Sequence, residues 1–244
     1  MTTCNTFCAI KHIFTNLGTV PPLAVWQRVS HFFHTFVQVN FKLSQIMTPE
    51  QLSEVKKMMT DKLYNANFSE PLIELLNACH DKCRDYNELR STDVAGRDKA
   101  IKNLLGRTGK RCIVIQPFFC DFGFNIEVGE NFFANTNLLI LDEGKVTFGD
   151  NVFIAPNCSF YTAGHPIDSE LRNQGLEYSL PITVGSDVWI CGNVTVVPGV
   201  TIGSNTVIGA GSVVTHDIPS GVVAAGNPCR VIRPITEADK LQYR

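Results

Sequence analysis

Residues 184–214 of the chain read VGSDVWICGNVTVVPGVTIGSNTVIGAGSVV and repeat every six residues. Counted in sixes, including backwards from this stretch, an apolar residue returns nine times: Phe148, Ile154, Phe160, Val184, Ile190, Val196, Ile202, Ile208 and Val214. Four positions further on stand residues that are mostly small or β-branched: Val188, Val194, Val200, Thr206, Ser212 and Ile218. A period of six fits neither an α-helix nor the simple alternation of a strand. It indicates a structural repeat.

A six-residue period is typical of a triangular β-coil. Each side of the triangle needs an apolar residue that points inward, and each corner favours glycine, Asn or Asp, which turn easily. Three repeats make one coil, and stacked coils pair as parallel strands that bury one another's apolar side chains. We therefore expect a mostly β fold, a parallel β-helix. Residues 166–183 break the pattern and should form an external loop, while residues 142–145 should form a shorter excursion.

The β-helix is expected to span residues 110–235 and to follow a small helical domain, residues 47–109. Thr48 and Pro49 offer an N-cap and a proline at the first helical position. A second helix should begin near Ser69, and a third should run from about Asp93 to Leu105, each with apolar residues at helical spacing. Residues 236–244 form a C-terminal tail.

Residues 1–46 contain no Asp or Glu, and Lys11, Arg28 and Lys42 give them a charge of +3. We favour a poorly ordered extension of unknown role, with Met47 as an alternative start. The other interpretation is an organelle-targeting segment, for which three basic residues are few.

Composition excludes several classes of protein. Apolar residues make up 44% of the 244 residues and charged residues 18%, as in a folded domain rather than a disordered chain. A net charge of −2 gives no general attraction for nucleic acid or anionic membrane, and no apolar run reaches the length of a spanning helix. Nine scattered cysteines indicate a reducing compartment, and we expect a cytoplasmic protein. Cys79 and Cys83 share a helical face, but no second Cys/His pair joins them, which favours apolar packing over a metal site.

His165 is the candidate for catalysis in the repeat region. It stands at the end of an in-register repeat, where the external loop is expected to leave the coil. Pro166 restricts the backbone of His165 to an extended conformation and so fixes the direction of its side chain. A rigid, half-exposed imidazole suits a general base, although a lone histidine is more often structural.

Several short motifs identify a family. They are CDFGFNI (120–126), NFFAN (131–135), IAPN (154–157), TAGHPI (162–167), PITVG (181–185), VWI (188–190), PGVTIG (198–203) and GNPCRVI (226–232). With them, residues 47–235 closely resemble the maltose/galactoside O-acetyltransferase family of hexapeptide acyltransferases. The resemblance implies a left-handed β-helix and transfer of an acetyl group from acetyl-CoA directly to a sugar hydroxyl, without a metal.

The resemblance also implies roles for individual residues. His165 matches the catalytic base, and Asn135 matches a side chain that contacts both the acceptor and the acetyl region, where it would also serve cofactor binding. Asp121 and Glu143 match polar positions that line the acceptor site. Trp189 matches an aromatic residue near the active site, and a packing role at a trimer contact is nearly as good an interpretation.

For acetyl-CoA, the resemblance implies a binding path along the coil and a homotrimer with each active site between two subunits. The matching residues are Gly192 and Ala210 for the pantetheine arm, and Thr215, His216, Arg230 and Arg233 for the nucleotide. Two departures stand out. His216 replaces a lysine common in the family, and Asn65, Ala66 and Asn67 occupy a stretch where an acceptor-binding aspartate is expected, which leaves the sugar open.

Three other functions remain as alternatives. The same fold could acetylate a xenobiotic alcohol or an amino alcohol, although the helical domain favours a sugar. It could serve as a non-catalytic scaffold, which would not bind CoA. A zinc hydrolyase is disfavoured, because such a site needs three histidines and the coil offers only His165 and His216.

Overall fold

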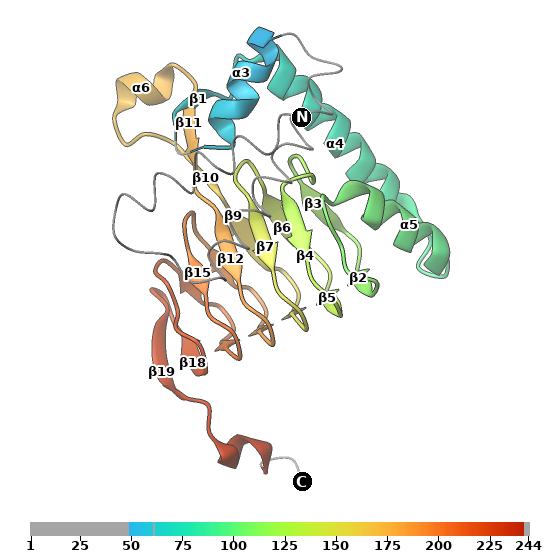
Figure 1. Cartoon of the computed structure of the whole chain (residues 1–244), viewed down its shortest axis with the longest axis vertical. Coiled ribbons are helices and arrows are strands. Elements are labelled where there is room, and N and C mark those ends of the chain that lie inside the picture. The colour runs from blue at the N-terminus through green and yellow to red at the C-terminus, as the bar shows by residue number, and fades with distance from the viewer. Residues whose placement is uncertain (1–48, 61, 242–244) are drawn as a thin grey trace, which may run out of the picture. The chain divides into compact units, whose positions relative to one another are not determined.

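In the part of the chain that the computed structural model describes, residues 49–60 and 62–241, the six-residue repeat folds into a triangular coil with a β-sheet on each side (Figure 1). The interpretations given for residues 1–46 and the expected N-cap at Thr48 concern residues outside these ranges. The seven-stranded face contains β2 (Cys112–Val114), β5 (Phe132–Ala134), β8 (Phe153–Ile154), β13 (Trp189–Ile190), β16 (Val207–Ile208), β18 (Val222–Ala225) and β19 (Arg230–Pro234). The five-stranded face contains β3 (Phe118–Cys120), β6 (Leu138–Leu141), β9 (Ser159–Tyr161), β14 (Thr195–Val196) and β17 (Val213–Val214). The four-stranded face contains β4 (Ile126–Val128), β7 (Val146–Phe148), β12 (Ile182–Val184) and β15 (Thr201–Ile202).

The core of the coil consists of the two repeated series of residues. All nine positions of the first register, from Phe148 to Val214, are at most 1% exposed. The second series, from Val188 to Ile218, is also buried, so each six-residue repeat points two side chains inward. The coil strands pair in parallel, as in Val184 with Ile202 and with Phe148, whereas β19 runs antiparallel to β18. The mostly β, parallel coil expected from the period is confirmed.

The three corners of the coil turn by different means. We number them in chain order: the first corner follows the seven-stranded face, the second follows the five-stranded face, and the third follows the four-stranded face. Left-handed backbone conformations at the first and third corners are taken by Asn131, Asn137, Asn151, Asn157, Asp187, Asn193 and Asn205. Short polar side chains tolerate this conformation better than other L-residues do. Those of Asn131, Asn151 and Asp187 also form a hydrogen-bonded ladder along the third corner, with distances of 3.0 and 2.9 Å.

The second corner is irregular, because the chain leaves the coil there three times. Residues 121–125 and 142–145 make short excursions, the second as expected from the sequence. The external loop follows Tyr161 and contains β10 (Ala163–Gly164), α6 (Ser169–Asn173) and β11 (Leu176–Ser179). The expected bounds of this loop, residues 166–183, lie too far along the chain, because the loop begins after Tyr161 and ends before Ile182. Ile182 is fully buried and already pairs with Val146, because its apolar side chain belongs to the coil.

Helices cover the first coil of the β-helix, where strand edges would otherwise be open (Figure 1). Helix α3 spans Pro49–Met58, α4 spans Glu70–Glu88 and α5 spans Val94–Leu104. Ser69 is the N-cap residue of α4. At the start of α5, the Asp93 side chain accepts a hydrogen bond from the Gly96 N–H group. The Asn87 amide donates to the Phe118 carbonyl and accepts from the Phe118 N–H group, both at 2.9 Å. Such a helix satisfies the exposed edge of the sheet.

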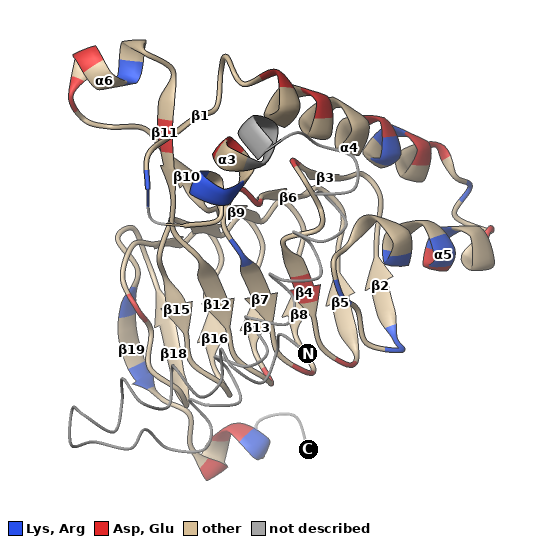
Figure 2. Ribbon diagram, turned by 45° about the horizontal axis from the view of Figure 1, so that its top comes forward, with Lys and Arg blue, Asp and Glu red and all other residues tan. Residues whose placement is uncertain are grey.

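The remaining elements complete the two ends of the described chain. Strand β1 (Tyr64–Asn65) pairs with β11 of the external loop, which joins the helical region to the loop. A 3₁₀-helix, Glu237–Lys240, follows β19. Charged residues gather on the helices and at the corners, while the strands of the coil carry few (Figure 2). Among the described residues, no helix combines the length and the apolar character needed to cross a membrane.

The corner ladder predicts a graded loss of stability on substitution. Asn151 has φ of 55°, and an Ala side chain disfavours this conformation by on the order of 1 kcal/mol. We expect Asn151→Ala to lower the free energy of unfolding more than Asn151→Gly. Both variants lose the hydrogen bonds of the ladder, but glycine adopts the positive φ of this turn without the steric cost that alanine has. Urea unfolding at matched protein concentration measures both. A glycine variant less stable than the alanine variant would contradict the conformational explanation.

Candidate active site

A cavity of about 440 Å³ lies at the second corner, between the coil, helix α4 and the external loop. Its polar lining comes from distant parts of the chain: Tyr64 from β1, Asp121 and Glu143 from the short excursions, and His165 and Glu177 from the external loop. Each departs from the regular repeat. The cavity therefore exists because the coil is interrupted at this corner.

His165 follows β10 at the mouth of this cavity, and its side chain is half exposed. Its Nε2 atom lies 3.6 Å from Oε1 of Glu177, which is a favourable ion-pair distance. The Tyr64 hydroxyl donates to the other Glu177 oxygen at 2.8 Å and so holds that carboxylate in place. Gly164 permits the close approach of β11, since a Cβ atom there would lie 2.5 Å from the Tyr178 ring. The imidazole is thus positioned by both the coil and the loop.

Three carboxyl groups lie beside or beneath the cavity. The Asp121 carboxylate accepts a hydrogen bond from His80 Nε2 of α4 at 3.0 Å. Asp142 is fully buried, its Oδ1 atom accepts from the backbone N–H groups of Asp121 and Phe122, and burial raises its pKa to about 7. Burial, followed by the hydrogen bond and charge of Asp121, raises the pKa of Glu143 to about 9. A neutral Glu143 can donate a hydrogen bond to a ligand.

Apolar side chains complete the cavity. It is also lined by Leu72, Ile73 and Leu76 of α4, by Phe122 of the first excursion and by Leu141 of β6. Ala66 and Asn67, in the stretch that departs from the family pattern, also line the cavity. A ligand with hydroxyl groups on one side and an apolar face on the other would suit this lining.

The structure distributes the residues predicted from the sequence over several places. His165, Asp121 and Glu143 meet in the cavity, whereas Asn135 and Trp189 are not among the residues that line it. The partly buried Asn135 lies at the first corner, where its side chain accepts from the Thr136 N–H group at 2.8 Å. Trp189 is 53% exposed on the outside of the seven-stranded face.

The residues predicted to bind acetyl-CoA lie on two corners and on β19. Gly192 and Ala210 follow the neighbouring strands β13 and β16 at the first corner, and Asn135 follows β5 at the same corner, two coils before Gly192. Thr215 and the exposed His216 lie at the second corner, further along the coil from His165. Arg230 is exposed on β19, and Arg233 forms a bidentate ion pair with Asp239 at 2.7 and 2.9 Å, which would compete with a phosphate.

Sequence reasoning missed Glu177 and Tyr64, which hold the histidine from outside the repeat. They pair across β1 and β11, although 113 residues separate them in the chain. It also missed Cys120, which joins Cys79 and Cys83. Neither set carries a spacing signal, because each is assembled from segments that are far apart in sequence.

Comparison with known proteins identifies the family of this chain. A sequence model of the maltose acetyltransferase hexapeptide capping motif matches residues 57–109, and a model of the bacterial transferase hexapeptide matches residues 181–216. Galactoside O-acetyltransferase of Escherichia coli is 50% identical over 159 residues, 65% of this chain and 78% of that protein. The chain belongs to the maltose and galactoside O-acetyltransferase family.

Solved structures of this O-acetyltransferase family share the fold. A maltose O-acetyltransferase from Clostridium difficile is 49% identical with a TM-score of 0.74, covering 75% of this chain and 98% of that one. A galactoside acetyltransferase in complex with coenzyme A is 45% identical with a TM-score of 0.74, covering 77% and 93%. The left-handed parallel β-helix implied by the resemblance is therefore the fold of this family member, and its capping motif corresponds to the helices over the first coil.

The raised pKa of Glu143 predicts a stability that depends on pH. Between the ordinary value of 4.5 and about 9, folded Glu143 holds a proton that the unfolded chain has released. The free energy of unfolding should therefore fall as pH rises through this window, by at most about 1.4 kcal/mol per pH unit from one group. Glu143→Gln should remove this part of the fall.

Urea unfolding of both proteins at about pH 6 and about pH 8.5 measures the effect. Asp142, whose pKa is raised to about 7, remains in both proteins, and its titration adds to the pH dependence of both. The same pH dependence in the wild type and in Glu143→Gln would show that Glu143 is ionised in the folded state.

Proposed function

We propose that this family member transfers the acetyl group of acetyl-CoA to a sugar hydroxyl, with His165 as the general base. Family membership supports the acetyl-CoA-dependent O-acetyl transfer. The observation that carries the assignment of the base is the position of His165, which lies at the mouth of a cavity for an acceptor and 3.6 Å from a carboxylate.

The geometry suits direct transfer. With the N–H group at Nε2 facing Glu177, Nδ1 is left to accept the proton of the acceptor hydroxyl. The oxygen then attacks the thioester carbonyl, a tetrahedral intermediate forms, and its collapse releases CoA while the proton passes from His165 to the leaving sulfur. The Glu177 carboxylate stabilises the imidazolium that exists in between. Because no acyl-enzyme forms, both substrates must be bound together.

The lining of the acceptor cavity favours a sugar as the acceptor. Asp121 offers acceptor oxygens, while the protonated Glu143 offers a donor, and a sugar hydroxyl can use both. The apolar residues of α4 suit the C–H face of a sugar ring or an apolar aglycone. A xenobiotic alcohol or an amino alcohol would use the apolar wall more than the carboxyl groups, so a panel of acceptors distinguishes them.

A homotrimer would complete the site. His165 and His216 lie at the second corner, whereas Asn135 and Gly192 lie at the first. A second copy that brings its first corner against the second corner of its neighbour unites the two sets, and the pantetheine arm would lie between them.

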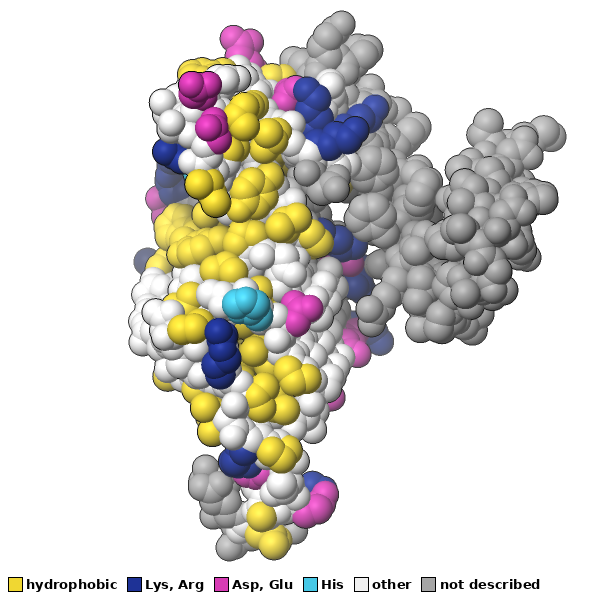
Figure 3. Space-filling view, turned by 90° about the vertical axis from the view of Figure 1, so that its left-hand side faces the viewer, with side chains coloured by type: hydrophobic (Ala, Val, Ile, Leu, Met, Phe, Trp, Pro, Cys, Tyr) yellow, Lys and Arg dark blue, Asp and Glu magenta, His cyan; other side chains and the backbone are white. Residues whose placement is uncertain are grey.

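Exposed apolar side chains support this assembly. Phe153 and Trp189, which are neighbours in register on the seven-stranded face, are 43% and 53% exposed, and Ile167 of the external loop is 97% exposed. Hydrophobic side chains gather on the side of the molecule that carries this loop (Figure 3). Monomers rarely leave contiguous apolar surface open to water, so the assembly would bury it.

The role of the base predicts a large loss in one variant. His165→Ala should lower kcat by about 10²–10⁴-fold, because the hydroxyl loses its proton acceptor. Release of the CoA thiol from acetyl-CoA with a panel of sugars measures the rate. His216→Ala is the matched control, and it should raise the KM for acetyl-CoA with little change in kcat.

Further arms of this assay separate the alternatives. Glu177→Gln keeps a hydrogen-bond partner for Tyr64 but loses the charge, so it should lower kcat by less than His165→Ala does. Equal rates for the wild type and His165→Ala would overturn the proposed base. No heat of CoA binding in calorimetry would favour the non-catalytic scaffold.

Assembly predicts the effect of a charge on the seven-stranded face. The wild type should elute at three times the 27.0 kDa chain mass by size exclusion with light scattering. Trp189→Glu should dissociate the trimer and abolish acetyl transfer, although His165 is intact. Val94→Glu places the same charge on an exposed apolar position of α5 and should do neither. A monomeric, active wild type would refute the shared site.

A further inference from the structure

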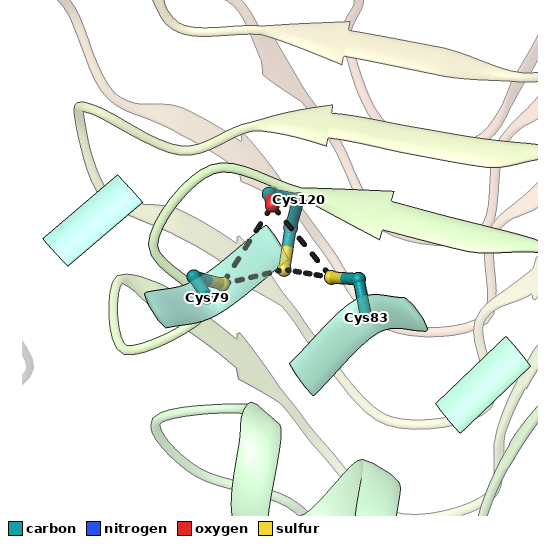
Figure 4. A group of neighbouring side chains, drawn as sticks. All are labelled: Cys79, Cys83 and Cys120. Atoms are coloured by element: carbon teal, nitrogen blue, oxygen red, sulfur yellow. Dashed lines mark hydrogen bonds between the residues drawn. The ribbon is translucent and has the colours of Figure 1, made fainter. Parts of the chain in front are cut away.

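Three cysteine thiols converge on one point behind the acceptor cavity. Cys79 and Cys83 are one turn apart on α4, and Cys120 ends β3, the strand that α4 covers. Their residues are 3%, 0% and 1% exposed, and all three sulfur atoms lie within 4.8 Å of one another. The sulfur atoms point toward one another rather than into separate parts of the core (Figure 4).

The spacing of the sulfur atoms is that of ligands around a single ion. The Sγ atom of Cys120 lies 3.7 Å from that of Cys79 and 3.8 Å from that of Cys83. Metal–thiolate bonds of about 2.3 Å place two sulfur ligands about 3.8 Å apart in a tetrahedral site and about 4.0 Å apart in a trigonal one. Only small movements of the side chains would bring all three sulfur atoms to bonding distance of a common centre.

The number and type of ligands in the three-cysteine group indicate which metal ion it would bind. Among residues 49–60 and 62–241, no other His, Cys, Asp or Glu joins these three thiols to form a larger ligand group. Zinc in a structural site requires a fourth ligand, whereas soft monovalent copper is satisfied by three thiolates. We propose that Cys79, Cys83 and Cys120 bind one copper(I) ion in a three-coordinate site.

The arrangement of the thiols sets them apart from the other cysteines, since the Cys120 sulfur lies within hydrogen-bond distance of both the Cys79 and the Cys83 sulfur. In the described chain, the other free cysteines, Cys112, Cys158, Cys191 and Cys229, form no such group. Apolar packing alone explains one buried thiol but does not explain why three sulfur atoms meet.

The site would couple metal binding to the acceptor cavity. Cys120 is followed directly by Asp121, which lines the cavity and contacts His80, a residue that lies between Cys79 and Cys83 on the same helix. A bound ion would tie α4 to the first coil and restrain this carboxylate. Copper takes no part in acetyl transfer, and its binding can be measured without either substrate.

Anaerobic titration of the full chain with copper(I) against a chromophoric copper(I) chelator tests the site. We expect one copper(I) ion per chain. The affinity for copper(I) should fall at least about 100-fold in Cys79→Ser, Cys83→Ser and Cys120→Ser, because removing a ligand lowers metal affinity more than removing a residue that only orients a ligand. Cys158→Ser removes another buried thiol and should bind as the wild type does. Circular dichroism shows whether each variant is folded.

X-ray absorption of the copper-loaded wild type provides a test that needs no variant. Three sulfur neighbours at about 2.3 Å are expected. Nitrogen or oxygen ligands, two sulfur ligands, or unchanged affinity in a folded Cys120→Ser variant would overturn the site. Tighter binding of zinc than of copper(I) by the same three cysteines would overturn the assignment of the ion.

Discussion

The stacking of apolar side chains inside the coil is the interaction on which the rest of the structure depends. No single turn of this coil can bury its own inward residues, because each turn is only one chain thick. Phe148, Phe160 and Val196 are covered by residues of the turns before and after them, and all three are at most 1% exposed. The first turn has no predecessor, so α4 and α5 take that place, and Asn87 satisfies the edge of β3.

The function depends on departures from this regularity. The first and third corners turn on Asn and Asp residues that repeat from coil to coil, whereas the second corner lets the chain leave the coil. Because the coil is rigid, residues that interrupt it are held firmly while remaining accessible. His165, Asp121 and Glu143 come from three such interruptions, and α4 closes the space between them. A rigid scaffold with irregular segments at one corner is a common way to place catalytic groups.

Buried carboxyl and thiol groups lie close to the acceptor cavity. Asp142 and Glu143 are carboxyl groups kept out of water, and the pKa of each is raised by burial. Cys120 directly precedes Asp121, so Asp121 borders both an acceptor cavity and the proposed copper site. In this arrangement α4 does more than cover an edge, since it contributes ligands, apolar wall and the His80 contact to one region.

The period of six by itself determined the coil, its inward residues and the presence of an external loop, because the side chains that each repeat buries must be apolar or small. The residues at which the loop leaves and rejoins the coil were fixed by the tertiary structure. It also pointed to His165, whose position at an interruption is visible in the chain. Only the tertiary structure decided that Glu177 and Tyr64 support this histidine, that Cys120 meets two helical cysteines, and that Asn135 lies on a different corner from His165. Contacts of that kind join segments far apart in the chain, where neither spacing nor periodicity records which side chains will meet.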